Sequence, residues 1–310
     1  MKERSEYLRI SIAGDLGSGK STIARELRKR TGFEVHSTGD IQRVIASERN
    51  MSTLELNKYA ENHPEIDHEV DRVTKNLGKE PKSLIIDSRM AWHFIPDSFK
   101  IYLQVNPVIA AKRILPDQTR PSEEYANLED AVFDLGERKE SEKKRFKALY
   151  DVDCSAMENY DIVVDTTLVS PSEIADVIIL EFAKWKRGNP VHKFWISPKL
   201  MYPTQRIVAL AGIKAKQIID LMKRDGYDYS YPVDVVKYNR YLFIFDGHKR
   251  TSAALMNSIS LIPIYIRAAD NEEVIHGLTV SKFIETSLNL SWIYEWEDCH
   301  KFTFFEYPKR

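Results

Sequence analysis

The stretch Gly14-Asp15-Leu16-Gly17-Ser18-Gly19-Lys20-Ser21-Thr22 decides how the N-terminal half of the chain folds. It follows the pattern of a Gly, four residues of any kind, and Gly-Lys-Ser, which cradles the phosphates of a nucleoside triphosphate. An apolar run at 8–13 precedes it and predicts a buried strand, and apolar residues at helical spacing follow it up to Gly32. A strand, a glycine turn and a helix start direct successive backbone N–H groups into one concavity, where the helix dipole also stabilises an anion.

This pattern assigns roles to the residues of the loop. Lys20 is expected to reach the β- and γ-phosphates, and the Ser21 hydroxyl is expected to bind Mg²⁺. The sequence therefore predicts ATP and Mg²⁺ as cofactors, with the phosphates held by Gly14, Gly17, Ser18, Gly19, Lys20, Ser21 and Thr22. The alternative is an ordinary glycine-rich turn, but a chance match in a chain of this length is on the order of one in a hundred.

The composition is that of a globular protein with room for two domains. The chain has 310 residues, of which 43% are hydrophobic and 29% charged. It has two distant cysteines, Cys154 and Cys299, and it lacks both a secretory signal and an apolar run long enough to cross a membrane. We therefore expect a cytoplasmic protein without membrane contact. The net charge of −1 argues against a surface specialised for nucleic acid.

The order of apolar segments predicts the domain organisation. Strands alternate with helices over the first 180 residues, which is typical of an α/β fold with a parallel sheet and helices on both faces. The stretch 186–190, Lys-Arg-Gly-Asn-Pro, indicates a boundary between a first domain at 1–188 and a second, smaller α+β domain at 189–310. Residues 116–147 are dense in charge, and they are interpreted either as a solvated helical hairpin or as a mobile lid over phosphates.

The first 180 residues resemble the cytidylate kinases, in particular the compact archaeal type. The resemblance is carried by Thr38-Gly39-Asp40-Ile41-Gln42-Arg43, Asn57-Lys58-Tyr59-Ala60-Glu61, Pro64-Glu65-Ile66-Asp67, Asp87-Ser88-Arg89-Met90-Ala91-Trp92, Arg138, Ser141-Glu142, Arg145-Phe146 and Tyr150-Asp151-Val152-Asp153. It implies a nucleoside-monophosphate-kinase-like fold and transfer of the γ-phosphate of ATP to a pyrimidine nucleotide. The sequence departs from the family at 134–137, where the lid is usually richer in arginine, and His93 stands where the family has small residues. These departures leave the identity of the acceptor open.

Phosphoryl transfer needs in-line positioning and neutralisation of charge, and the resemblance supplies residues for both. Arg43 and Arg89 are planar forks suited to an acceptor phosphate, with Asp40 and Asp67 also on the acceptor side. Asp67 and Asp71 are spaced to contact a base or to be solvated. Asp87, at a predicted strand end, is placed to hold magnesium through water. Arg138 and Arg145 are seven residues apart on one helical face and are expected to close over the transferring group, although each arginine has the alternative role of a surface ion pair.

The second domain resembles the ParB/sulfiredoxin superfamily and, within it, the free-serine kinases. The carrying residues are 196–198, 203–206 and the run Asp246-Gly247-His248-Lys249-Arg250-Thr251. The resemblance implies a second anion site at Asp246, Gly247, His248, Lys249 and Arg250, at a predicted helix start. The relatives' catalytic acid has a counterpart in Asp246, but 204–206 supplies no acidic base, which favours a domain without turnover of its own. The aromatic C-terminal tail, 292–307, is typical of a core or of a homodimer contact.

Three hypotheses remain open. The first is an ATP-dependent pyrimidine-nucleotide kinase with a regulatory second domain, which predicts ADP release with CMP. The second is a kinase for a hydroxymethyl group on a modified pyrimidine within DNA, such as 5-hydroxymethyluracil, with the ParB-like domain binding the DNA. The third is a nucleotide-gated binding protein. The near-neutral charge favours the first hypothesis, the domain fusion favours the second, and the acceptor-side arginines argue against the third.

Overall fold

In a computed structural model, which describes residues 6–115 and 127–308, the chain divides into two compact units, Met1–Val191 and His192–Arg310. The predicted boundary was at 188. The first part of the predicted lid, 116–126, and the first five residues lie outside the described ranges. Within those ranges, no helix is long and apolar enough to span a membrane.

The first unit is built around a parallel sheet. Its strand order is β2-β3-β1-β4-β5. The strands are β1 (Arg9–Gly14), β2 (Glu34–Ser37), β3 (Leu84–Asp87), β4 (Phe99–Gln104) and β5 (Ile162–Asp165). Every residue of β1 is buried, as expected for a central parallel strand covered on both faces. The predicted fold class of the first domain, an α/β P-loop kinase-like sheet with helices, is confirmed.

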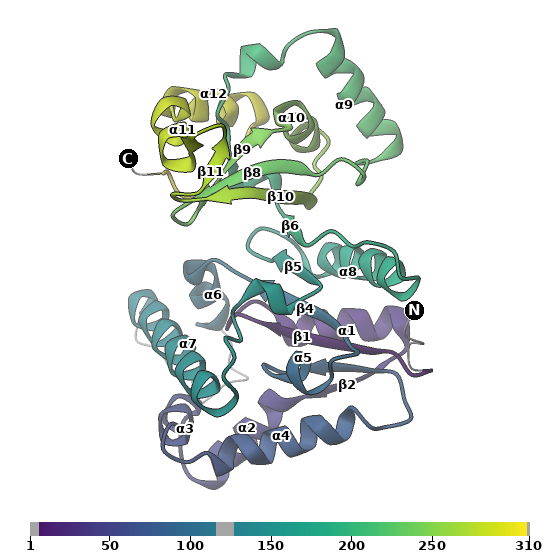
Figure 1. Ribbon diagram of the computed structural model, residues 1–310, viewed down its shortest axis with the longest axis vertical. Coiled ribbons are helices and arrows are strands. Elements are labelled where there is room, and N and C mark those ends of the chain that lie inside the picture. The colour runs from purple at the N-terminus through teal and green to yellow at the C-terminus, as the bar shows by residue number, and fades with distance from the viewer. Residues whose placement is uncertain (1–5, 116–126, 309–310) are drawn as a thin grey trace. The chain divides into compact units, whose positions relative to one another are not determined.

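Helices cover this sheet, and Figure 1 shows their arrangement. They are α1 (Lys20–Thr31), α2 (Thr38–Glu48), α3 (Thr53–Ala60), α4 (Glu65–Leu77), α5 (Ala91–Phe94), α6 (Pro107–Ile114), α7 (Leu128–Tyr150) and α8 (Pro171–Lys186), with a 3₁₀ turn η1 (Met157–Asn159). Helix α1 packs against α8, α5 against β1, and α6 against α7. Two helix starts have the capping boxes that their sequences predict, Ser52 with Glu55 and Ser170 with Glu173. The described part of 116–147 forms one helix, α7, and residues 116–126 lie outside the described ranges, so both the hairpin and the lid stay predictions.

The second unit has a mixed sheet in the order β6-β10-β8-β9-β7. Its strands are β6 (Phe194–Ile196), β7 (Met201–Tyr202), β8 (Val233–Tyr238), β9 (Tyr241–Asp246) and β10 (Ile262–Ala269), with a separate hairpin of β11 (Glu273–Ile275) and β12 (Leu278–Thr279). Its helices are α9 (Ile213–Asp225), α10 (His248–Met256), α11 (Val280–Ser287) and α12 (Leu290–His300), with 3₁₀ turns η2 (Pro198–Leu200) and η3 (Ile207–Leu210).

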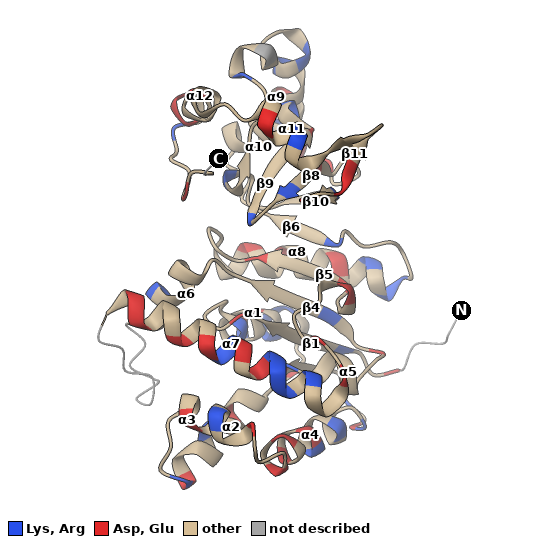
Figure 2. Ribbon diagram, turned by 60° about the vertical axis from the view of Figure 1, so that its left-hand side comes forward, with Lys and Arg blue, Asp and Glu red and all other residues tan. Residues whose placement is uncertain are grey.

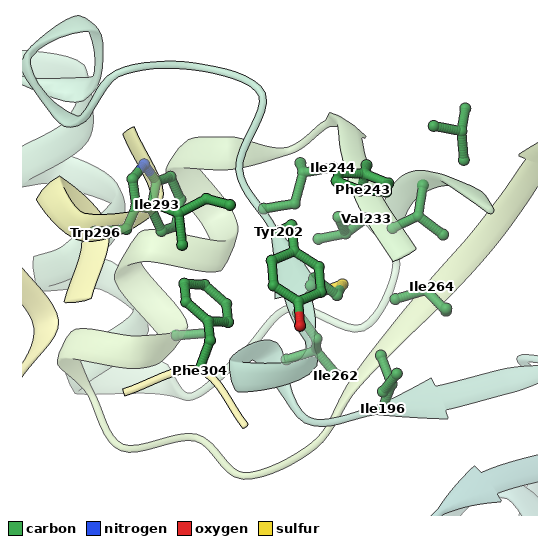
Figure 3. Close-up of a cluster of buried hydrophobic side chains, with 14 of the residues drawn as sticks. Ile196, Tyr202, Val233, Phe243, Ile244, Ile262, Ile264, Ile293, Trp296 and Phe304 are labelled. Atoms are coloured by element: carbon green, nitrogen blue, oxygen red, sulfur yellow. The ribbon is translucent and has the colours of Figure 1, made fainter. Parts of the chain in front are cut away.

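One apolar core holds the second unit together (Figure 3). Tyr202 stacks on Phe304 with ring centroids 4.8 Å apart and lies against Phe243 at 5.5 Å. Trp296 is fully buried, and its Nε1 donates to the Gln205 carbonyl over 3.0 Å. Part of the aromatic tail is therefore core, which is one of the two roles that its composition predicts.

Candidate functional site

The phosphate-binding loop joins β1 to α1, and its glycines set its shape. Gly14, Gly17 and Gly19 have φ angles of 141°, 74° and 84°, a region that side chains rarely adopt. A Cβ on Gly14 would lie 2.2 Å from the Leu103 carbonyl oxygen, so this glycine lets the loop pass against β4. The loop therefore brings its backbone amides to the N-terminus of α1 in the arrangement that suits phosphate.

Cationic and oxygen-bearing side chains surround this loop. Lys20 Nζ donates to the carbonyls of Gly14 at 3.1 Å and Asp15 at 2.8 Å. Loss of hydration, followed by repulsion from Arg89, lowers the pKa of Lys20 to about 7. The lysine is thus poised to regain its charge when an anion arrives. Arg89 also donates to the Gly14 carbonyl, so both cations contact the same point of the loop.

The predicted magnesium ligands are brought together. Ser21 Oγ donates to Asp87 Oδ2 over 3.0 Å, and Asp87 is buried at the end of β3. Oxygen ligands from one hydroxyl and one carboxylate fit Mg²⁺, which keeps several waters and takes further oxygens from substrate phosphates. Among the described residues there is no cluster of three or more His, Cys, Asp or Glu side chains that could hold a metal without substrate.

These residues line one cavity of about 110 Å³. Its wall combines the phosphate-binding loop with residues from other elements: Leu16, Gly17, Gly19, Lys20, Ser21, Thr22, Ser37, Thr38, Gly39, Gln42, Arg43, Asp87, Ser88, Arg89, Arg138 and Glu142. Arg43 and Arg89, the predicted acceptor-side arginines, are both part of it. Asp40, predicted beside them, forms an ion pair with Arg43 and is itself largely exposed. The cavity thus has cationic side chains both from the phosphate-binding loop and from the elements that face it.

The two predicted lid arginines are separated by the structure. Arg138 lines the phosphate cavity, whereas Arg145 lines a neighbouring one with Asp67 and Asn57, and Gln42 contributes to both cavities. Arg145 Nε lies 2.7 Å from Asp67 Oδ2, and both side chains are 3% exposed. The two arginines lie about two turns apart on one side of α7, and each meets different partners there.

Asn57 and Asp67 define the character of this second cavity. Arg145 donates through Nη1 to the Asn57 carbonyl at 2.9 Å and through Nη2 to its side-chain oxygen at 3.1 Å. Burial raises the pKa of Asp67 to about 6, against the opposing effect of Arg145. A carboxylate and a guanidinium side by side can recognise the polar edge of a base.

Sequence reasoning missed several contacts of the loop. Asp15, assigned no role, accepts from the Tyr102 hydroxyl at 2.8 Å, from the Val105 amide at 3.1 Å and from Lys139 at 2.7 Å. Glu142 was part of the family resemblance but had no assigned role, although its spacing of four from Arg138 on a helix was a signal for an ion pair. Figure 2 shows acidic residues over the first part of α7 and basic residues toward its C-terminal end. Charge alone does not tell the buried members of this helix, such as Glu142 and Arg145, from its solvated ones.

The predicted anion site of the second unit forms only in part. Gly247 caps α10 with φ 103°, and Arg250 pairs with Asp246 at 3.0 Å. His248 is buried instead, where its Nε2 accepts from the Thr204 amide at 3.2 Å, and burial lowers its pKa to about 4. This neutral histidine supports the packing of the turn, which leaves Lys249 and Arg250 as the cations of the helix start.

The parallel sheet, the glycine loop and the cationic cavity define a P-loop kinase, a class that uses ATP and Mg²⁺. A model of the AAA domain family (AAA_18) matches residues 10–134. The cytidylate kinase of Thermoplasma volcanium is 35% identical over 176 residues, which cover 56% of this chain and 90% of the relative. The chain therefore belongs to the family of the archaeal cytidylate kinases through its first unit.

Two further similarities were found. An S-adenosylmethionine-dependent nucleotide dehydratase of Lacinutrix mariniflava is 32% identical over 189 residues, which cover 60% of this chain and 37% of that protein. Among solved structures, the shikimate kinase of Bacteroides thetaiotaomicron aligns with a TM-score of 0.41 and 12% identity over 57% of this chain and 98% of that one.

Proposed function

We propose that the first unit transfers the γ-phosphoryl group of ATP to the phosphate of a pyrimidine nucleoside monophosphate, CMP or a close analogue. The observation that supports this most is the placement of Arg43 and Arg89 in the same cavity as Lys20. A triphosphate already has the loop amides and Lys20 as donors, so the extra guanidinium groups suit a second phosphate.

In the proposed reaction an oxygen of the acceptor phosphate forms a bond to the γ-phosphorus. The bond from that phosphorus to the bridging oxygen breaks, and ADP leaves with the electron pair. Lys20 and Arg138 would neutralise charge on the transferring group, while Arg43 and Arg89 would hold the acceptor in line. Mg²⁺ beside Ser21 and Asp87 would neutralise further phosphate charge when bound.

The neighbouring cavity favours cytosine as the base. Cytosine presents an amino donor beside ring and carbonyl acceptors, and a carboxylate accepts from that amino group. Asp67 supplies the carboxylate, and Arg145 supplies donors for the acceptors. Uracil has a carbonyl in place of the amino group. Its carbonyl oxygen and the Asp67 carboxylate are both hydrogen-bond acceptors, so they would repel each other.

The test is a transfer assay with γ-labelled ATP and CMP, UMP, dCMP and AMP as acceptors. We expect CMP to be labelled best, and Arg89→Ala to lose about 10²-fold or more in kcat/KM, the typical cost of a lost charged donor at a transition state. Arg28→Ala is the matched control, because Arg28 is an exposed arginine on α1. If no free monophosphate is labelled, the proposal is wrong; labelling of hydroxymethylated DNA instead would support the DNA kinase alternative.

We further propose that the second unit is a ParB/sulfiredoxin-like domain with an anion site at the start of α10. Two of its family-like segments meet in the fold, since Thr204 Oγ1 lies 3.0 Å from His248 Nε2. The test is the number of labelled nucleotides bound per chain. We expect two in the wild type and one in either Lys20→Ala or Lys249→Ala; one in the wild type would reject the second site.

A further inference from the structure

A carboxylate lies in the wall of the phosphate cavity. Glu142, on α7, lines it together with Lys20 and Arg89, although its side chain is only 7% exposed. A buried negative charge repels phosphates and is costly unless it is paired. Its presence in this place therefore requires a compensating role.

Its two oxygens contact two different arginines. Oε2 lies 2.8 Å from Arg89 Nε, and Oε1 lies 3.4 Å from Arg138 Nε. Burial alone would raise the pKa of Glu142, but Arg89 and Arg138, with smaller effects of Arg145 and Lys20, hold it below its usual value. The carboxylate is therefore ionised and joins two cations that come from separate parts of the chain.

We propose that Glu142 is a positioning residue that fixes Arg89 and Arg138 for phosphoryl transfer, which rests on the function proposed above. An arginine side chain has many rotamers, and a donor contributes most when it is held in place before the charge develops. In both ion pairs the carboxylate oxygen lies near Nε, the nitrogen that joins the guanidinium group to its side chain, so Glu142 restrains the orientation of each guanidinium plane. Arg89 in turn donates to the Gly14 carbonyl, which links α7 to the phosphate-binding loop.

Glu142 also limits repulsion among the cations. Arg89 lowers the pKa of Lys20, whereas Asp87 and Glu142 raise it. Removing the charge of Glu142 leaves Lys20 facing the guanidinium groups with less compensation.

The test compares Glu142→Gln with Glu140→Gln, an exposed glutamate on the same helix. A displacement of about 1 Å of a positioned group costs up to ~10²-fold, so we expect kcat for CMP to fall about 10- to 100-fold in Glu142→Gln. The KM for ATP should change less than about threefold. Arg138→Ala should lower kcat much less in the Glu142→Gln background than in the wild type. Glu140→Gln should behave as the wild type. A kcat within twofold of wild type, or additive losses, would overturn the proposal.

An acceptor-independent readout separates this proposal from the proposed function. The Nε–H signals of arginine in ¹⁵N-labelled protein should include two that shift in Glu142→Gln and stay in place in Glu140→Gln. If they do not move, Glu142 does not hold the arginines, whichever acceptor the enzyme uses. If Glu142→Gln fails to fold, Glu142→Asp decides: retention of the signals with partial activity supports the proposal, and loss of activity with intact signals overturns it.

Discussion

The closest backbone approach of the phosphate-binding loop leads to a prediction about two of its glycines. Replacing Gly14 by Ala would place a Cβ 2.2 Å from the oxygen and 2.6 Å from the nitrogen of Leu103, its partner in the β1–β4 pairing. Replacing Gly19 by Ala is the matched control, because its φ is also positive but, apart from Gly19 and its two chain neighbours, no atom of the described residues lies within 4 Å of the added Cβ.

The expected magnitudes differ. Gly14→Ala combines backbone strain of about 1–3 kcal/mol with overpacking of about 1–3 kcal/mol, so a loss of about 4 kcal/mol in the free energy of unfolding is expected. Gly19→Ala has only the conformational cost of roughly 1–2 kcal/mol. At about 2–4 °C per kcal/mol for a domain of this size, the Tm of the first unit should fall by about 8–16 °C in Gly14→Ala.

Scanning calorimetry of both variants measures this difference, and the transition of the first unit is recognised because MgATP raises it. Gly19→Ala should lower that Tm by about 2–8 °C. Equal shifts in the two variants, or a Gly14→Ala protein within about 2 °C of the wild type, would refute the steric reasoning.

Three further predictions address the titrating groups and the second unit. Because the pKa of Lys20 is about 7 and a bound anion raises it, ATP binding at pH 8 should take up about 0.9 proton, and the affinity for ATP should weaken as the pH rises above 7. Titration calorimetry in buffers of different ionisation enthalpy measures this proton uptake, which should be missing in Lys20→Arg. Because Asp67 protonates below about pH 6, kcat/KM for CMP should fall below that pH. Asp67→Asn should lose this pH dependence, lower kcat/KM for CMP about 10- to 100-fold and keep the KM for ATP. A variant that keeps both the pH dependence and the wild-type kcat/KM contradicts the base-side role. Trp296→Ala, which empties a fully buried site, should destabilise the second unit by about 3–5 kcal/mol in urea unfolding while the Tm of the first unit stays unchanged.

Local chemistry explains which features the sequence could predict. The capping boxes at Ser52 and Ser170 and the glycine loop depend on neighbours within a few residues, and the structure contains them. The parallel sheet of the first unit follows from the alternation of strands and helices along the chain. These features need little knowledge of the rest of the fold.

Tertiary neighbours explain what the sequence could not predict. Arg138 and Arg145 look equivalent on α7, but Arg145 meets Asp67 and Asn57, which come from α4 and α3. His248 looks like part of an anion site, yet it is buried against Thr204, a residue 44 positions away. In each case the spacing of residues along the sequence predicts the helix, whereas packing against distant segments determines the role of the side chain.

We propose that transfer occurs at the first unit and that its acceptor carries a phosphate. The most direct measurement is label transfer from γ-labelled ATP to CMP by the wild type, Lys20→Ala and Asp246→Ala. We expect the wild type and Asp246→Ala to label CMP, and Lys20→Ala to leave it unlabelled. Labelling that survives in Lys20→Ala, or that is lost in Asp246→Ala, would instead place the chemistry in the second unit.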